Sequence, residues 1–194
     1  MKQLLALPEL ASFSLVGGTN LALRLGHRIS IDIDLFTANT FDMVEVKDAI
    51  ARAFPEAIEL SARNQTLLYQ INGVKTDLIR HQYNDISVVD NVDGMRLASL
   101  PDVVAMKLGA VAGRGAKKDF WDIYALSSKF TIKEMMDYYV QKYPASDPGQ
   151  IVRSLVYFND ADQQPDPVDL LAVSWAAVKT NLREHVKSYM NSIL

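Results

Sequence analysis

The sequence contains no cysteine in its 194 residues. Disulfide bonds and thiolate metal sites are therefore excluded, and a reducing compartment is permitted. The chain also lacks a surplus of positive charge, because its formal net charge at pH 7 is −3. This balance argues against a broad surface that coats nucleic acid, although it leaves room for a local basic patch around one phosphate.

Long apolar runs are absent as well. The apolar run near the start, Leu4–Leu7, ends at Pro8 and is too short for a signal peptide. No stretch approaches the roughly 18 apolar residues that a membrane helix requires. We therefore expect a cytoplasmic protein without a membrane partner.

The predicted elements divide the chain into two parts, and no internal repeat is present. Strands are predicted at residues 12–16, 29–36, 57–63 and 66–80, with a weak strand pair around Asn91; helices are predicted at residues 20–25, 42–54, 99–113, 116–129 and 131–143, from residue 148, and at residues 168–193. Asn72-Gly73 predicts a type I′ hairpin turn. The pattern predicts an α/β (α+β) fold, with an N-terminal mixed-sheet lobe at residues 1–98 and a C-terminal helical lobe at residues 99–194.

Two aspartates stand one residue apart in a predicted strand, in the segment "ISIDIDLF". On a strand, Asp32 and Asp34 point to the same face, with Cα atoms roughly 7 Å apart, so both carboxylates can reach one divalent cation. Unpaired carboxylates on a half-buried strand repel each other, and a cation relieves that repulsion. The alternative is that they cap loops or pair with Arg24 and Arg28.

A third carboxylate, Asp77, lies in the second strand of the predicted hairpin, in "GVKTDLIRH". It is either an edge residue or a site residue. If its strand lies beside that of Asp32 and Asp34, the three carboxylates form a cluster suited to Mg²⁺.

Gly17 and Gly18 precede a predicted short helix that Thr19 can cap and Gly26 can end. Glycines allow backbone N–H groups to approach an anion closely, and the start of a helix favours negative charge. No Gly-Lys-Ser/Thr sequence follows, so this is not a P-loop. The turn is either a phosphate-binding site or a tight turn alone.

These motifs resemble those of a known family. "GGTNLALRLGHRISIDIDLF" is similar to the first motif of the nucleotidyltransferases related to the AbiEii/AbiGii toxins, within the polymerase-β-like superfamily. The similarity continues through "VKTDLIRH" and "LPDVVAMKLGAVAGRGAKKDFWDIYAL", and it covers roughly residues 12–130. It implies a Mg²⁺-dependent enzyme that transfers a nucleotidyl group from a nucleoside triphosphate and releases pyrophosphate.

The same resemblance implies roles for individual residues. Asp32, Asp34 and Asp77 would be the ligands of a two-metal Mg²⁺ site. Nucleotide contacts would come from the glycine turn and from the segment before the aspartates, namely Gly17, Gly18, Thr19, Arg28 and Ser30. A separate antitoxin would be the partner, and the acceptor would be an RNA (tRNA) end or a protein hydroxyl.

Lys107 lies in an otherwise apolar predicted helix, and the resemblance places it with Asp119 in a later catalytic and nucleotide-binding motif. The alternative is a surface lysine that extends its charged end into solvent. Asp119 and Asp122 share one helical face, so either is the site acid and the other a salt-bridge partner; we favour Asp119. If Lys107 is partly solvated, Lys107→Met should change stability by less than about 1 kcal/mol.

Two other functions compete with a toxin-type nucleotidyltransferase. One is a nucleotidyltransferase that modifies a small molecule such as an antibiotic, and the other is a non-catalytic interaction module of the same fold. The three aspartates argue against the non-catalytic module.

Overall fold

The computed structural model describes residues 1–193 and divides the chain into two compact units. The sheet unit comprises Met1–Asn20 and Ser30–Ser99, and the helical unit comprises Leu21–Ile29 and Leu100–Leu194. The predicted fold class, a mixed sheet followed by helices, is confirmed.

The sheet unit contains all the strands of the described residues. Its elements are α1 (Lys2–Leu5), η1 (Pro8–Leu10), β1 (Ser14–Leu15), the first turn of α2 (Gly17–Leu25), β2 (Ile33–Thr37), α3 (Met43–Ala53), β3 (Ile58–Arg63), β4 (Thr66–Ile71), β5 (Val74–Arg80), β6 (Asp90–Val92) and β7 (Met95–Leu97). The strand order is β3-β4-β5-β2-β1-β7-β6. β2 pairs in parallel with β5, and β1 pairs in parallel with β7, while the other neighbours are antiparallel.

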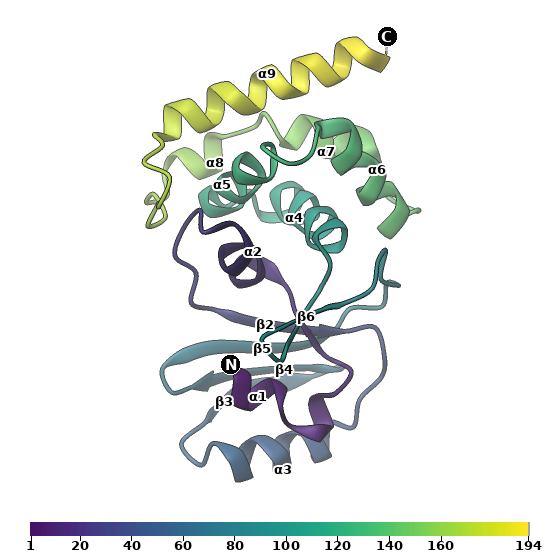
Figure 1. Cartoon of the computed structure of the whole chain (residues 1–194), viewed down its shortest axis with the longest axis vertical. Helices are drawn as coiled ribbons and strands as arrows, with labels where there is room; N and C mark the ends of the chain where they lie inside the picture. Colours follow the sequence, from purple (N-terminus) through teal and green to yellow (C-terminus); the bar gives the residue numbers. More distant parts are fainter. Residues whose placement is uncertain (194) are drawn as a thin grey trace. The chain divides into compact units, whose positions relative to one another are not determined.

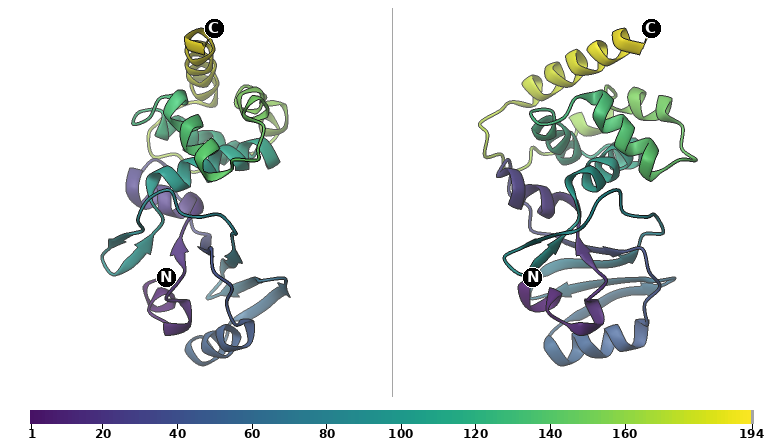
Figure 2. Two further views of the ribbon diagram at one scale, coloured as in Figure 1. Left: turned by 90° about the vertical axis from the view of Figure 1, so that its right-hand side faces the viewer. Right: turned by 45° about the vertical axis from the view of Figure 1, so that its right-hand side comes forward.

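One face of this sheet is apolar and carries α1, η1 and α3 (Figures 1 and 2). Leu35 of β2 lies opposite Leu78 of β5, which in turn lies opposite Leu67 of β4, and all three are fully buried. Because side chains alternate along a strand, the neighbours of Leu35 and Leu78 point to the other face. That face therefore carries Asp34 and Asp77.

The hairpin between β4 and β5 forms as its sequence predicts. Asn72 and Gly73 both have positive φ, +51° and +77°, as a type I′ turn requires. The left-handed conformation predicted for Gly26 after α2 is also present, with φ +60°. These local signals are confirmed because each depends on a conformation that few residue types adopt.

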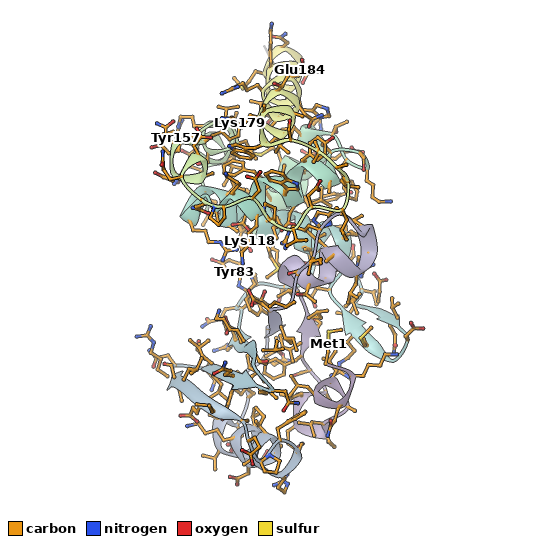
Figure 3. All side chains as sticks on the ribbon, turned by 90° about the vertical axis from the view of Figure 1, so that its left-hand side faces the viewer. Met1, Tyr83, Lys118, Tyr157, Lys179 and Glu184 are labelled. Atoms are coloured by element: carbon orange, nitrogen blue, oxygen red, sulfur yellow. The ribbon has the colours of Figure 1, made fainter. Side chains whose placement is uncertain are left out.

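The helical unit is built around α4. Its elements after α2 are α4 (Leu100–Arg114), α5 (Lys117–Leu126), α6 (Ile132–Lys142), α7 (Pro148–Ser154), α8 (Asn159–Asp162) and α9 (Trp175–Ile193). α4 packs against α5, α6 and α7, and α9 lies along the outer side of α5 and α6 (Figure 1). Lys179 of α9, labelled in Figure 3, forms an ion pair with Asp162 of α8 at 2.8 Å.

Two predicted boundaries are wrong. β2 begins at Ile33 rather than Ile29, and Ile29 and Ile31 are exposed. The last helix begins at Trp175 rather than at residue 168, because residues 168–170 pair with the backbone of residues 27–29. The short helix α8, directly after Phe158, is not among the predicted helices.

None of the helices described is both long enough and apolar enough to cross a membrane.

Candidate functional site

The glycine turn lies between β1 and α2, where the backbone passes directly against the second aspartate. Gly17 has φ +69°, and a Cβ atom at this position would lie 2.2 Å from Oδ2 of Asp34. Any larger residue would collide with that carboxylate and would be strained in this conformation. Glycine at position 17 therefore allows the helix start and the acidic strand to touch.

Thr19 does not cap the helix as predicted, because α2 already begins at Gly17. Its buried hydroxyl instead donates to the backbone carbonyl of Asp32 and lies 3.1 Å from the hydroxyl of Ser30. These bonds hold the first turn of α2 to the segment that enters β2. Thr19 and Ser30 are thus beside the aspartates, where the sequence predicts nucleotide contacts.

Asp34 and Asp77 are direct neighbours on adjacent parallel strands. Their Cα atoms are register partners between β2 and β5, so both side chains point to the face opposite the apolar core. Asp32 precedes Asp34 by two residues, just before β2 begins. The strand arrangement that was a condition for an Asp77 site is therefore present.

Lys75 also belongs to this carboxylate group, and the sequence analysis did not single it out. Its Nζ lies 2.7 Å from Oδ2 of Asp77, two residues further along β5. The hydrogen bond to Asp77 raises the pKa of Lys75, and the charges of Asp34 and Asp32 add to this effect. The ammonium therefore lies within electrostatic reach of all three carboxylates.

The carboxylates of Asp32, Asp34 and Asp77 meet some, but not all, of the requirements of a site for a divalent cation. Oδ1 of Asp77 is buried without a hydrogen-bond partner, a costly arrangement that a cation would relieve. However, no three His, Cys, Asp or Glu side chains among the described residues are gathered as a coordination group. The residue types and backbone positions fit Mg²⁺, whereas one oxygen of Asp77 is bound to the Lys75 ammonium.

A second cluster of charged groups lies in the helical unit. Lys107 of α4 is only 4% exposed, so the alternative of a solvated surface lysine is wrong. Its Nζ lies 2.8 Å from Asp119 and 2.7 Å from Asp122, both fully buried on α5. Arg114 donates two hydrogen bonds to Asp119, at 2.7 and 2.8 Å.

Arg28 and His27 complete this cluster from the segment after α2. The guanidinium of Arg28 donates to both oxygens of Asp122, at 2.7 and 2.9 Å, and Nε2 of His27 lies 2.7 Å from Oδ1. The predicted nucleotide-binding residue Arg28 is therefore buried and bound to Asp122 in this structure.

The cluster stabilises its members in the charged state. Burial alone would raise the pKa of Asp122, but the ammonium of Lys107 and hydrogen bonds from His27 and Arg28 hold that pKa well below its ordinary value. Burial also opposes ionisation of Asp119, and Arg114 and Lys107 outweigh it. Burial would likewise lower the pKa of Lys107, but the two carboxylates raise it. The lysine and both acids are charged at neutral pH.

Asp119 and Asp122 on α5 thus both form an ion pair with Lys107, and they differ in their other partners. Asp119 accepts from Arg114, whereas Asp122 accepts from His27 and Arg28. The sequence around His27 shows no metal-ligand spacing, and the only signal for this residue is its place directly before Arg28, after the helix-ending Gly26.

Solved structures share the fold of this chain. A Helicobacter pylori protein provisionally assigned as a nucleotidyltransferase has a TM-score of 0.60 at 17% identity, covering 96% of this chain and 88% of that one. MenT4, a nucleotidyltransferase toxin from Mycobacterium tuberculosis, has a TM-score of 0.59 at 14% identity, covering 95% and 80%.

The chain belongs to the family described as nucleotidyl transferase AbiEii toxin, type IV toxin–antitoxin system, which it matches over residues 1–192. It is therefore a nucleotidyltransferase, as the sequence motifs predict. A curated relative, an uncharacterized protein from Aquifex aeolicus (strain VF5), is 32% identical over 189 residues, covering 93% of this chain and 89% of the relative.

Proposed function

We propose that this chain is a Mg²⁺-dependent, toxin-type enzyme that transfers the nucleotidyl part of a nucleoside triphosphate to an RNA end, such as that of a tRNA. Pyrophosphate is the leaving group. The observation that carries the proposal is the pairing of Asp34 with Asp77 beside the Gly17–Gly18 turn. Metal ligands and a phosphate-binding helix start must lie close together for this reaction.

Asp32, Asp34 and Asp77 would hold the cations. Mg²⁺, when bound, would neutralise charge on the triphosphate and lower the pKa of the attacking hydroxyl. Binding through Oδ2 of Asp77 would require the Lys75 ammonium, which lies 2.7 Å away, to leave that oxygen. Oδ1 of Asp77, which has no hydrogen-bond partner, is available without such an exchange.

The backbone N–H groups of Gly17, Gly18 and Thr19 would bind the triphosphate, because the first N–H groups of a helix have no partner within the helix. The Thr19 hydroxyl, which donates to the Asp32 carbonyl, would keep this turn next to the metal ligands. Roles of Arg28 and Lys107 toward the nucleotide stay predictions, since both are bound to carboxylates of α5 in this structure.

Membership in a toxin–antitoxin family supports a separate antitoxin as the partner of this chain. If the transfer reaction is the toxic activity, expression of the wild type should arrest growth, and expression of Asp34→Asn should not. Equal toxicity of both forms at equal protein levels would contradict this link.

The decisive experiment is to incubate the purified chain with each of four α-labelled nucleoside triphosphates, Mg²⁺, total RNA and total protein. We expect label in the RNA fraction, and none with EDTA or with Asp34→Asn. A matched control is Asp137→Asn, which removes an exposed carboxylate of the helical unit and should leave transfer unchanged.

The location of the label tests the acceptor. Label in a protein band would replace RNA by a protein hydroxyl, and label only in small molecules would favour an antibiotic-modifying enzyme. No transfer from any nucleotide by the folded wild type, under conditions where a control transferase is active, would contradict the proposed function.

A further inference from the structure

The helical unit contains a pocket of about 460 Å³ that the proposed reaction does not use. It is lined by the last turn of α2, the end of α5, the segment before α9 and α9 itself, through Arg24, Leu25, His27, Tyr124, Ala125, Ser127, Ser128, Lys129, Leu171, Asn181 and His185. Two of these residues carry permanent positive charge, two are histidines, and none is a carboxylate. The lining therefore favours an anionic ligand.

His27 gives the pocket a feature that its overall charge does not explain. The side chain is 1% exposed, and Nε2 is bonded to Asp122, yet Nδ1 is buried without a hydrogen-bond partner. An unpaired buried nitrogen is unfavourable and is uncommon in folded proteins. A ligand in this pocket is one way to supply the missing partner.

The hydrogen bond to Asp122 also determines what that partner must be. Asp122 is a carboxylate and accepts only, so Nε2 carries the hydrogen. In the neutral ring Nδ1 is then an acceptor, and it requires a hydroxyl or N–H donor. A ligand that combines a hydrogen-bond donor with negative charge matches the neutral form of this ring and the positive charge of the lining.

Arg24 and Lys129, which both line the pocket, would supply its positive charge. Arg24 lies in the last turn of α2 and Lys129 follows the end of α5, where cations also complement a helix dipole. A favourable interaction with the helix dipole is enough to explain why cations lie at these two helix ends. It explains neither the pocket that both residues line nor the buried Nδ1 of His27, which has no hydrogen-bond partner.

We propose that this pocket binds the phosphorylated ribose of a nucleotide, either free or at the end of an RNA. Arg24 and Lys129 would bind the phosphate, and a ribose hydroxyl would donate to Nδ1 of His27. Leu25, Leu171 and Tyr124 provide apolar surface for the sugar or base. The volume lies within the range that is usual for small-ligand sites, about 300 to 1,000 Å³.

The test uses a background in which the site of the proposed function cannot contribute. The full chain carries Asp34→Asn and Asp77→Asn, and EDTA is present throughout. Inorganic phosphate, AMP and a short single-stranded RNA are titrated separately while NMR follows the ring nitrogens of His27. We expect AMP or the RNA to move the Nδ1 signal and to bind more tightly than phosphate.

A double variant, Arg24→Gln with Lys129→Gln, should weaken this binding at least about tenfold. The matched control, Lys133→Gln with Arg153→Gln, also removes two cations of the helical unit, from exposed ion pairs, and should bind as tightly as the parent.

Several outcomes would overturn the proposal. One is that none of the three ligands moves the ring signals of His27. Another is that phosphate and AMP bind with equal affinity and the RNA binds no more tightly. Equal loss in the two double variants would show a general charge effect instead. Tighter binding of AMP than of the RNA identifies a free nucleotide as the ligand, and the reverse identifies an RNA end. Because metal is absent throughout, failure here leaves the proposed transfer reaction untouched.

Discussion

Lys107 shows how far a single residue can depart from its sequence expectation. A lone lysine in an apolar helix is consistent with a side chain that reaches solvent. In the structure it is instead almost fully buried between Asp119 and Asp122. The sequence cannot reveal this, because the two carboxylates come from the next helix and approach only when α4 and α5 pack.

The small effect on stability that we expected for Lys107→Met depends on a partly solvated ammonium. That condition is not met, because Lys107 is buried. Removal of the ammonium leaves two buried carboxylates with fewer positive partners. Breaking a buried ion pair costs about 3–5 kcal/mol, so we expect a loss of that order in the free energy of unfolding. Urea denaturation followed by circular dichroism measures it.

The control for this variant is Lys133→Met, which removes an exposed lysine paired with Asp137 on α6. Exposed pairs of this kind contribute less than about 1 kcal/mol. If the two variants lose the same stability, the buried cluster does not have the strength assigned to it.

Lys75 gives a second prediction at this scale, one that depends on the proposed metal site. Its ammonium lies 2.7 Å from Asp77 and within electrostatic reach of Asp34 and Asp32, where it competes with a divalent cation for the same oxygens. We expect Lys75→Gln to increase the affinity for Mn²⁺ several-fold, because the competing charge is removed. Electron paramagnetic resonance of free Mn²⁺ measures this affinity without any turnover.

Lys47→Gln serves as the control, since it removes an exposed lysine paired with Glu59 outside the carboxylate group. Weaker Mn²⁺ binding by Lys75→Gln would show that the lysine supports the site rather than competes for it.

At the scale of elements, the sequence predicts well where a local signal is strong. Asn72-Gly73 forms its turn, Asp42 caps α3, and Thr131 with Glu134 forms a reciprocal capping box on α6. Each signal acts through the backbone of its own neighbours. Residues 168–170 have no such signal, and their structure depends on pairing with residues 27–29, which are distant in the sequence.

The capping box of α6 permits a quantitative test. The Thr131 side chain accepts from the backbone N–H of Glu134, and the Glu134 carboxylate accepts from the backbone N–H and the hydroxyl of Thr131. Thr131→Ala removes the hydroxyl, and we expect a loss of about 1 kcal/mol in the free energy of unfolding. Thr40→Ala, at an exposed position outside any helix, should change it by less than about 0.5 kcal/mol. Equal effects would argue against the capping role.

For the whole molecule, the carboxylates of the sheet unit could be singled out from alternation and motif spacing, and the same-face placement of Asp77 and Asp34 follows once their strands lie side by side. The alternation along each strand determines the face, and the hydrophobic neighbours determine which face is buried. The pocket beside His27 could not be predicted, since its lining joins the end of α2 to α5 and α9, which are distant in the sequence. No local pattern in the sequence brings these segments together.

The buried cluster should also set the pH range in which the whole chain is stable. In the folded state the pKa values of Asp119 and Asp122 lie below their ordinary value of 3.8, and that of Lys107 lies above 10.5. The stabilisation from the aspartates is complete above their unfolded-state pKa and is lost as pH falls toward the folded-state values. The stabilisation from Lys107 is complete below its unfolded-state pKa and is lost as pH rises through the folded-state value. This contribution should therefore be constant between about pH 5 and pH 9 and should decline on both sides.

Asp122→Asn isolates this contribution, because it keeps the size of the side chain and removes the charge that Lys107, Arg28 and His27 share. We expect the variant to be less stable than the wild type at pH 7, with a difference that shrinks as the pH falls from 5 toward 3. Urea midpoints measured at intervals across this range test both parts. The control Asp137→Asn, an exposed carboxylate, should follow the wild-type curve closely. A stability difference for Asp122→Asn that stays the same from pH 7 to pH 3 would show that Asp122 does not stabilise the fold through its charge.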